Sequence, residues 1–188
     1  MSFTRTANLG FPRIGGQREL KFALESYWAG KSEESDLLAT AQLLRGSHWT
    51  LQQEAGIETP PSNDFSLYDH VLDMAATLGA VPARFNHTGG AVNLSTYFAM
   101  ARGAKTAPAM EMTKWFDTNY HYVVPEFEPG MRYRLQSAKQ VDAYLEAKAL
   151  GVENEAGAAR TGFFRAIGQT HRCKCLSGRG AGCDSSSL

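Results

Sequence analysis

The sequence predicts a helix-rich α/β protein that is incomplete, because its strands are too few to close a sheet or a barrel. Several segments place apolar residues at the spacing of one helical face, which predicts helices packed on a core. Short apolar runs and turns rich in Gly and Pro separate these segments, as in chains where strands alternate with helices. The chain has 188 residues, 43% of them hydrophobic, which is enough for one domain with a core.

Helices are expected where the apolar periodicity is sustained and ends near a glycine. Ser32 and Asn93 have side chains suited to cap the helices that follow them. Ser137 and Gln140 have the spacing of a capping box. The expected helices span residues 18–29, 32–55, 69–78, 93–102 and 138–149.

The pattern also predicts which helix faces are buried and where strands lie. The second helix should face the core with a stripe that runs from Leu37 through Leu51 to Ala55, and the last helix should turn Val141, Tyr144 and Leu145 inward. Strands need residues that suit a pleated, half-buried surface. They are expected just before Pro12, at residues 65–68 and at residues 119–124.

Residues 9–21 predict an anion-binding site. A short apolar run ends in a proline and two glycines, and an amphipathic helix with Arg18 and Lys21 in its first turn follows. Free N–H groups at a helix N-terminus and cationic side chains can converge on one anion. From the residues alone, two solvated surface charges are the alternative interpretation.

Composition and charge exclude several classes of function. The 19 Lys and Arg residues balance the 19 Asp and Glu residues, so no net charge draws the chain to nucleic acid. No apolar run is as long as a membrane span, and residues 1–6 lack the apolar core of a signal peptide. A soluble cytoplasmic protein is expected, with neither nucleic acid nor membrane among its partners.

The histidines in the body of the chain are weak candidates for chemistry. His48 lies on an apolar helical face and is expected to be a structural core histidine. His70 follows Asp69 at a helix start and suggests a capping detail. His121 lies among aromatic residues and is the most site-like, although a structural role suits it equally. The roles of three nearby polar residues stay open: Arg13, Asp117 and Asn119.

Residues 153–188 differ in character from the rest of the chain. They are rich in Gly, Ala, Arg and Ser and have no sustained period, which predicts a disordered tail. The candidate metal ligands there are His171, Cys173, Cys175 and Cys183. Because the close pair is Cys-x-Cys rather than the wider spacing of zinc sites, no metal site is expected.

Long blocks with a fixed order carry a resemblance. They include Leu-Gly-Phe-Pro-Arg-Ile-Gly at 9–15, Arg-Glu-Leu-Lys at 18–21 and Glu-Met-Thr-Lys-Trp-Phe at 111–116. Together they resemble the N-terminal end of cobalamin-independent methionine synthase, over about residues 7–152. Further blocks that match this family are residues 25–31, 68–71, 81–84, 119–122 and 124–127.

The resemblance implies a fold, a reaction and a set of binding residues. In that family two (βα)₈ barrels pack together, so residues 1–152 would form an incomplete N-terminal part of a TIM-like barrel. The family transfers a methyl group from 5-methyltetrahydropteroyltriglutamate to homocysteine in methionine biosynthesis. The resemblance implies that this folate cosubstrate, whose polyglutamate tail is a string of carboxylates, contacts Arg18, Glu19, Leu20, Lys21 and Lys114.

The family's zinc belongs to a second barrel, for which this chain has no matching residues. Zinc turns the thiol of homocysteine into a thiolate, which is the nucleophile. The resemblance therefore implies that this chain has no catalytic residue and no metal ligand. It is expected to bind the folate tail but to be inactive alone, unless another polypeptide supplies the missing barrel.

The resemblance ends near residue 152, where the family continues with a buried strand. Codons can be chosen for residues 154–164 that, read one base later, encode Thr-Lys-Pro-Val-Leu-Leu-Gly-Pro-Val-Ser, much as in that strand. Residues 153–188 are therefore expected to be an unrelated, frameshifted tail. The nucleotide sequence around codon 153 tests this expectation.

Two other functions stay open at this point. One is a stand-alone module that binds small polyanions through Arg18, Lys21 and Lys114. The other is a truncated gene product without function, because part of a barrel leaves apolar edges and helix faces uncovered. Calorimetry with a folate polyglutamate separates the first from the second, which should also melt without cooperativity.

Overall fold

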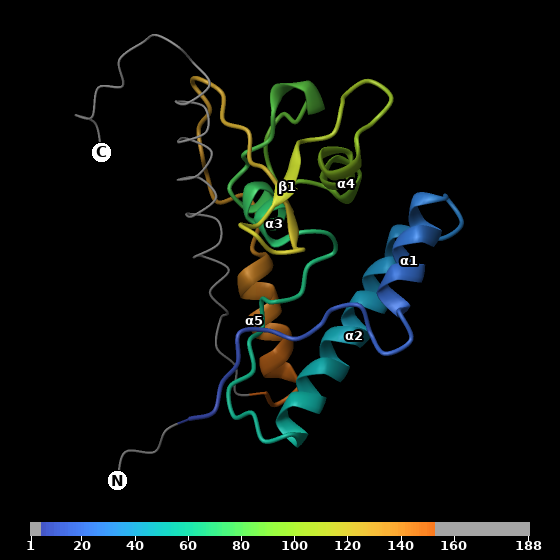
Figure 1. Ribbon diagram of the computed structural model, residues 1–188, viewed down its shortest axis with the longest axis vertical. Helices are drawn as coiled ribbons and strands as arrows, with labels where there is room; N and C mark the ends of the chain where they lie inside the picture. The colour runs from blue at the N-terminus through green and yellow to red at the C-terminus, as the bar shows by residue number, and fades with distance from the viewer. Residues whose placement is uncertain (1–4, 153–188) are drawn as a thin grey trace, which may run out of the picture.

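The computed structural model describes residues 5–152, which form a helix-rich α/β structure (Figure 1). The first two helices lie side by side and run in opposite directions, and the last helix lies beside the lower half of the second (Figure 1). The remaining elements gather around a small hairpin. The helices are α1 (Glu19–Trp28), α2 (Glu34–Glu54), α3 (His70–Thr77), the short 3₁₀ helix η1 (Ala83–Phe85), α4 (Leu94–Arg102) and α5 (Lys139–Ala149).

Side chains at the helix starts explain where α3 and α4 begin. The Asp69 carboxylate accepts the N–H of Leu72 at 2.9 Å, and the Asn93 side chain accepts the N–H of Thr96 at 2.8 Å. Each bond satisfies a backbone donor that has no partner within its helix. The cap predicted at Asn93 is confirmed, and the five helices predicted from periodicity are all present within one or two residues of their expected ends.

The cap predicted at Ser32 is wrong, and the one predicted at Ser137 forms in part. Glu33, not Ser32, caps α2, because its longer side chain reaches the first turn while Asp36 bonds back to the Glu33 N–H at 3.0 Å. The expected box of Ser137 and Gln140 forms only in its first half, because the Ser137 hydroxyl accepts the N–H of Lys139 at 3.2 Å while Gln140 does not bond back to Ser137. The Gln140 amide instead donates to the hydroxyl of Thr77 at the end of α3.

Two predicted helix faces also differ from the structure. In α2 the buried stripe turns away from Leu51, which is 51% exposed, and reaches Trp49 instead. In α5, Val141 and Leu145 are more than half exposed, while Tyr144 is half-buried. The face of α5 that meets the core carries small residues, which allow a close approach. Those buried residues are Ala143 and Ala147.

Within residues 5–152 the sheet is one antiparallel hairpin of β1 (Met112–Lys114) and β2 (His121–Val123). Its register pairs Met112 with Val123 and Lys114 with His121. The strand predicted at 119–124 is confirmed in its central part, whereas residues 65–68 form no strand. The run before Pro12 contributes only an isolated parallel bridge between Ala7 and Thr59.

The predicted α/β class is therefore confirmed, and the barrel stays a prediction. A (βα)₈ barrel is built from parallel strands, and within residues 5–152 the parallel pairing is limited to the bridge of Ala7 with Thr59. The expectations for residues 153–188, namely a frameshifted, disordered tail with no metal site, lie outside the described residues.

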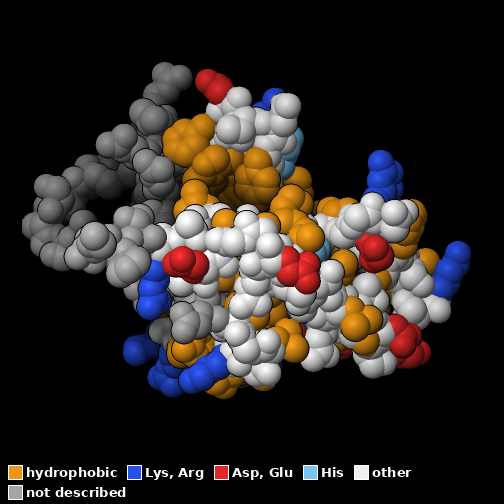
Figure 2. Space-filling model, turned by 90° about the horizontal axis from the view of Figure 1, so that it is seen from below, with side chains coloured by type: hydrophobic (Ala, Val, Ile, Leu, Met, Phe, Trp, Pro, Cys, Tyr) orange, Lys and Arg blue, Asp and Glu red, His pale blue; other side chains and the backbone are white. Residues whose placement is uncertain are grey.

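The main core joins α1, α2, α3 and α4 to the hairpin. Phe65 lies in this core although its segment is irregular. Hydrophobic side chains also reach the surface, and Figure 2 shows several separate groups of them on one face. No helix within residues 5–152 is long and apolar enough to span a membrane. The buried residues of the main core are Leu20, Leu24, Leu37, Ala41, Leu44, Phe65, Leu72, Tyr97, Phe98, Met100, Ala101, Met110 and Val123.

Candidate functional site

The start of α1 presents the cations that the sequence singled out. Arg18 is the N-cap residue and has a left-handed backbone, with φ 63° and ψ 33°. This conformation is uncommon for a residue with a side chain and is found more often at functional sites. The side chains of Arg18 and Lys21 are exposed, and Lys21 lies 3.7 Å from Glu25 one turn along the helix. Both cations are therefore accessible to a ligand.

The two other residues of this block face the protein. The Glu19 carboxylate turns back and accepts the N–H of Gln17 at 3.0 Å. Gly15 has φ 85°, which favours glycine, and a Cβ atom there would displace the same carboxylate, which would lie 2.1 Å away. Leu20 is fully buried in the core. Leu20 can therefore offer a ligand only its backbone groups. The Glu19 carboxylate stabilises the loop, and its negative charge does not attract an anion.

Lys114 lies at the end of β1 and is exposed. The turn that follows contains Phe116 with φ 52°, a second residue with a side chain in the left-handed region. His121 pairs with Lys114 across the hairpin, is exposed, and contacts the backbone carbonyl of Asn119 through Nδ1 at 3.1 Å. The described contacts of His121 are therefore structural.

The predicted cations lie on separate elements, because α1 and β1 stand apart (Figure 1). The segment 63–69 lies between them and bonds to both sides. On the α1 side, Arg13 Nη1 donates to the Ser66 carbonyl at 2.9 Å. On the hairpin side, the Tyr120 hydroxyl donates to Asp69 at 2.7 Å. The structure thus connects the two cationic regions through a buried polar segment, and not by direct contact.

Asp69 is the centre of the connection to the hairpin. It is only 2% exposed, and its carboxylate also accepts the N–H of Val123 at 3.3 Å. Burial raises the pKa of the Asp69 carboxyl, while the bonds from Tyr120 and from backbone N–H groups oppose this rise. Burial likewise raises the pKa of the Tyr120 hydroxyl, which stays a neutral donor at pH 7. This carboxylate therefore fixes the hairpin on α3.

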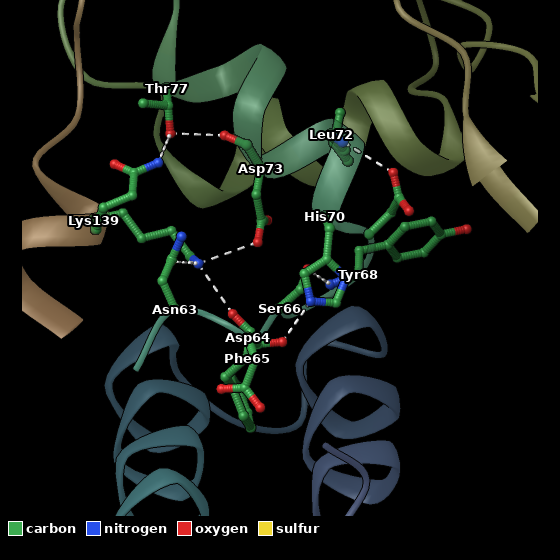
Figure 3. A network of polar contacts seen from close by, with 12 residues as sticks. Asn63, Asp64, Phe65, Ser66, Tyr68, His70, Leu72, Asp73, Thr77 and Lys139 are labelled. Atoms are coloured by element: carbon green, nitrogen blue, oxygen red, sulfur yellow. Dashed lines mark hydrogen bonds and ion pairs between the residues drawn. The ribbon is translucent and has the colours of Figure 1, made fainter. Parts of the chain in front are cut away.

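A second carboxylate, Asp73, lies one turn along α3 and is partly buried. Its Oδ1 accepts the Tyr97 hydroxyl at 2.6 Å. Its Oδ2 forms an ion pair with the ammonium group of Lys139 at 3.2 Å, and Figure 3 shows this pair. Burial raises the pKa of Tyr97, which therefore remains protonated and donates to the carboxylate. These contacts tie α3 to α4 and α5.

His48 contacts the loop at residues 9–13, and His70 contacts the segment on which that loop rests. The His48 ring packs on Phe11 with 4.8 Å between ring centroids, and burial lowers its pKa. His70 contacts the backbone carbonyl of Asp64 through Nε2 (Figure 3). His48 is half-buried against the loop rather than deep in the core, where the sequence placed it. Its structural role stays a prediction.

A cavity of about 320 Å³ lies between α2, α3, α4 and α5. Phe65, Tyr97 and Lys139 contribute to its wall, whereas the predicted binding residues do not line it. The described residues include no group of three His, Cys, Asp or Glu side chains that could hold a metal ion. The ligand set of a zinc site thus does not fit residues 5–152, and no chemistry is assigned to zinc in this part of the chain.

Comparison with known proteins decides the family. The family described as "Cobalamin-independent synthase, N-terminal domain" matches residues 5–158. The chain belongs to this family. Similar proteins of both bacteria and plants are called 5-methyltetrahydropteroyltriglutamate–homocysteine methyltransferase.

Three relatives illustrate the similarity of these synthases. The protein of Caulobacter vibrioides is 56% identical over 78% of this chain and 21% of its own length. The protein of Nitrosomonas europaea is 57% identical over 81% of this chain and 20% of its own length. The protein of Oryza sativa is 59% identical over 77% of this chain and 19% of its own length. The chain therefore spans about a fifth of the length of these curated relatives.

Sequence reasoning found the exposed cations and missed the buried segment that supports them. Asp69 could have been noticed, since it lies in a block shared with the family and has the residue type of an N-cap. Lys139 gave no signal, because a lysine at a helix start is usually solvated. Arg13 was noticed without a role, and the structure gives it one at Ser66.

Proposed function

We propose that this chain provides the part of a methionine synthase that binds the polyglutamate tail of 5-methyltetrahydropteroyltriglutamate. Arg18 and Lys21 on α1 and Lys114 on the hairpin bind tail carboxylates. Arg can bind a carboxylate through two parallel N–H bonds, and Lys acts as a point charge. The names of the relatives support this ligand, since each includes the pteroyltriglutamate group.

The observation that carries the proposal is backbone strain at Arg18 and in the turn that follows Lys114. Arg18 has φ 63°, and Phe116 in the turn after Lys114 has φ 52°. Each conformation costs about 1–3 kcal/mol and persists where the surroundings and the function require it. At Arg18 the strained backbone allows α1 to begin directly after the loop, with the guanidinium exposed beside the helix N-terminus.

The separation of the cations also suits a tail of several carboxylates. A single anion would need the three side chains to converge, whereas α1 and β1 stand apart (Figure 1). A chain of glutamates can place successive carboxylates on successive cations. Glu19 and Leu20 then act indirectly, because one holds the loop and the other anchors α1 in the core.

Titration calorimetry with two ligands tests the proposal. The triglutamate form of 5-methyltetrahydrofolate should bind about tenfold more tightly than the monoglutamate form, since it offers more carboxylates. Lys21→Gln and Lys114→Gln should each weaken triglutamate binding roughly threefold, a modest factor because both side chains are exposed to solvent.

Lys148→Gln is the matched control for these variants. Lys148 is an exposed lysine in the last turn of α5. This end of α5 lies away from α1 and the hairpin (Figure 1). Its replacement should leave the affinity unchanged. Equal affinity for the two ligands, or no heat at millimolar triglutamate, would remove the proposal.

Methyl transfer is proposed to require more than this chain. The relatives named as methyltransferases are about five times as long as the matched part. The described residues offer carboxylate-binding cations and buried structural carboxylates. We therefore expect no methyl transfer to homocysteine by the purified chain, and a measurable rate with the triglutamate cosubstrate would contradict this expectation.

A further inference from the structure

Lys139 begins α5, but its ammonium group binds outside its own helix. It donates to the side-chain oxygen of Asn63 at 2.8 Å and to the carbonyl of Phe65 at 3.0 Å (Figure 3). It also pairs with Asp73 at 3.2 Å. An ammonium group has three donors, and here they meet three acceptors from two segments. The contact therefore joins α5 to α3 and to the segment that precedes α3.

The segment 63–66 has no regular secondary structure, so side chains set its position. No helix or strand is assigned to these residues, although Asn63 is buried and Phe65 lies in the main core. In a strand or helix, repeated backbone bonds would fix the segment. Here the bonds from Lys139 to Asn63 and Phe65 replace part of that support.

The same segment is the base on which the loop at residues 10–13 rests. The Asp64 carboxylate accepts the N–H of Phe11 at 2.7 Å, and the Ser66 carbonyl accepts a bond from Arg13 at 2.9 Å. A Cβ atom on Gly10 would lie 3.3 Å from the Asp64 side chain, which shows how closely the loop approaches. Asp64 and Ser66 alternate with the two residues that Lys139 holds.

We propose that Lys139 is a positioning residue for the loop that leads into α1. Lys139 holds Asn63 and Phe65, and the residues between and after them hold Phe11 and Arg13. The link to ligand binding rests on the proposed function, because the loop ends at Arg18. Arg13 is bound through a single guanidinium nitrogen and keeps further N–H donors that can face a carboxylate.

Hydrogen exchange of the Phe11 amide tests this proposal without any ligand. Lys139→Met keeps a long side chain and removes the donors, and the Phe11 amide should then exchange about tenfold faster, the effect of weakening one hydrogen bond by RT ln 10. Lys148→Met removes the same charge from the other end of α5 and should leave this amide unchanged. Unchanged protection of Phe11 in a folded Lys139→Met chain overturns the proposal.

A milder variant keeps the test decisive if Lys139→Met does not fold. Asn63→Ser shortens one acceptor and leaves the bond from Lys139 to the Phe65 carbonyl. Exchange at Phe11 should rise by a smaller factor than in Lys139→Met. Parental protection at Phe11 in a folded Asn63→Ser chain likewise overturns the proposal.

Binding of the triglutamate folate then separates this inference from the proposed function. Lys139→Met should weaken binding several-fold, while Lys148→Met should not. If the parent chain binds no triglutamate, the proposed function fails while the exchange result still decides whether Lys139 positions the loop. Faster exchange at Phe11 with unchanged affinity in Lys139→Met overturns the link between Lys139 and the ligand site.

Discussion

The exposed cations and the buried segment between them differ in how they are held. Arg18, Lys21 and Lys114 are exposed, and the ion pair described for them is the one between Lys21 and its helical neighbour Glu25. Residues 63–69 carry several polar side chains at 4% exposure or less, and they are bonded to α3, α4, α5, the N-terminal loop and the hairpin. The buried segment is fixed from many sides, and the cations from few.

This difference suggests that the buried segment and the exposed cations have separate roles, one in stability and the other in binding. Buried polar groups cost free energy unless they are bonded, so a fully bonded segment has one defined position. Exposed lysine and arginine side chains keep their rotamer freedom and can adapt to a flexible ligand. Substitutions in the segment should therefore change stability, and substitutions of the cations should change binding.

The largest effect is expected from Asp69→Ala. It removes the N-cap of α3 and leaves the Val123 N–H and the Tyr120 hydroxyl without their acceptor. We expect a loss of about 2–4 kcal/mol in the free energy of unfolding, measured in urea. Asp142→Ala, at an exposed aspartate in the first turn of α5, should stay within about 0.5 kcal/mol. Equal losses would break the comparison.

A smaller effect concerns the pH dependence that Asp69 confers. Its pKa in the folded chain is raised above the ordinary value of 3.8, mainly by burial. The folded state therefore gains stability from Asp69 as pH falls through the raised pKa, and loses it as pH rises again. Asp69→Asn lacks this titration, so the stability of the parent relative to Asp69→Asn should increase from pH 7 towards pH 4. A difference that is constant with pH would contradict the raised pKa.

Arg18→Gly should separate stability from binding. Glycine adopts the backbone of Arg18 without strain, and we expect a gain of about 0.5–1 kcal/mol in the free energy of unfolding. The guanidinium is lost, so triglutamate binding should weaken. Arg18→Ala keeps the strain and also loses the charge, and it should weaken binding equally without the gain in stability. Urea unfolding and calorimetry measure both quantities.

The smallest effect is expected on the outer face of α5. Val141→Gln and Leu145→Gln replace side chains that are 56% and 54% exposed, and each should change stability by less than about 0.5 kcal/mol. Ala147→Leu, on the buried face, should cost about 1–3 kcal/mol through overpacking. Thermal unfolding in the same buffer compares them, and a large loss at Val141 would mean that its face is covered in solution.

The helices could be predicted because apolar periodicity reports a helix whatever its surroundings are. The faces were harder, because in α5 the larger residues Val141 and Leu145 suggested the core while the buried residues are alanines. A larger apolar side chain gains more free energy when it is buried, but a close approach between helices favours small residues. The sequence contains no signal for which of the two considerations decides.

The candidate site was predictable only in its exposed half. Arg18, Lys21 and Lys114 stand in recognisable blocks, whereas the support from Asp69 and Lys139 depends on contacts between distant parts of the chain. The expected strand at 65–68 shows the same limit, since Phe65 is apolar and buried but its segment is held by side chains rather than by a neighbouring strand. Local propensity does not report such contacts.

The bonds from Phe11 to Asp64 and from Arg13 to Ser66 each join residues 53 positions apart. Closing so long a loop costs entropy before the bonds form, whereas α1 and α2 are neighbours in sequence and can pair early. We therefore expect the pair of α1 and α2 to form first during folding, and the loop at residues 10–13 to dock late. A chain in which only α1 and α2 have paired would expose Arg18 and Lys21 without a fixed loop beside them.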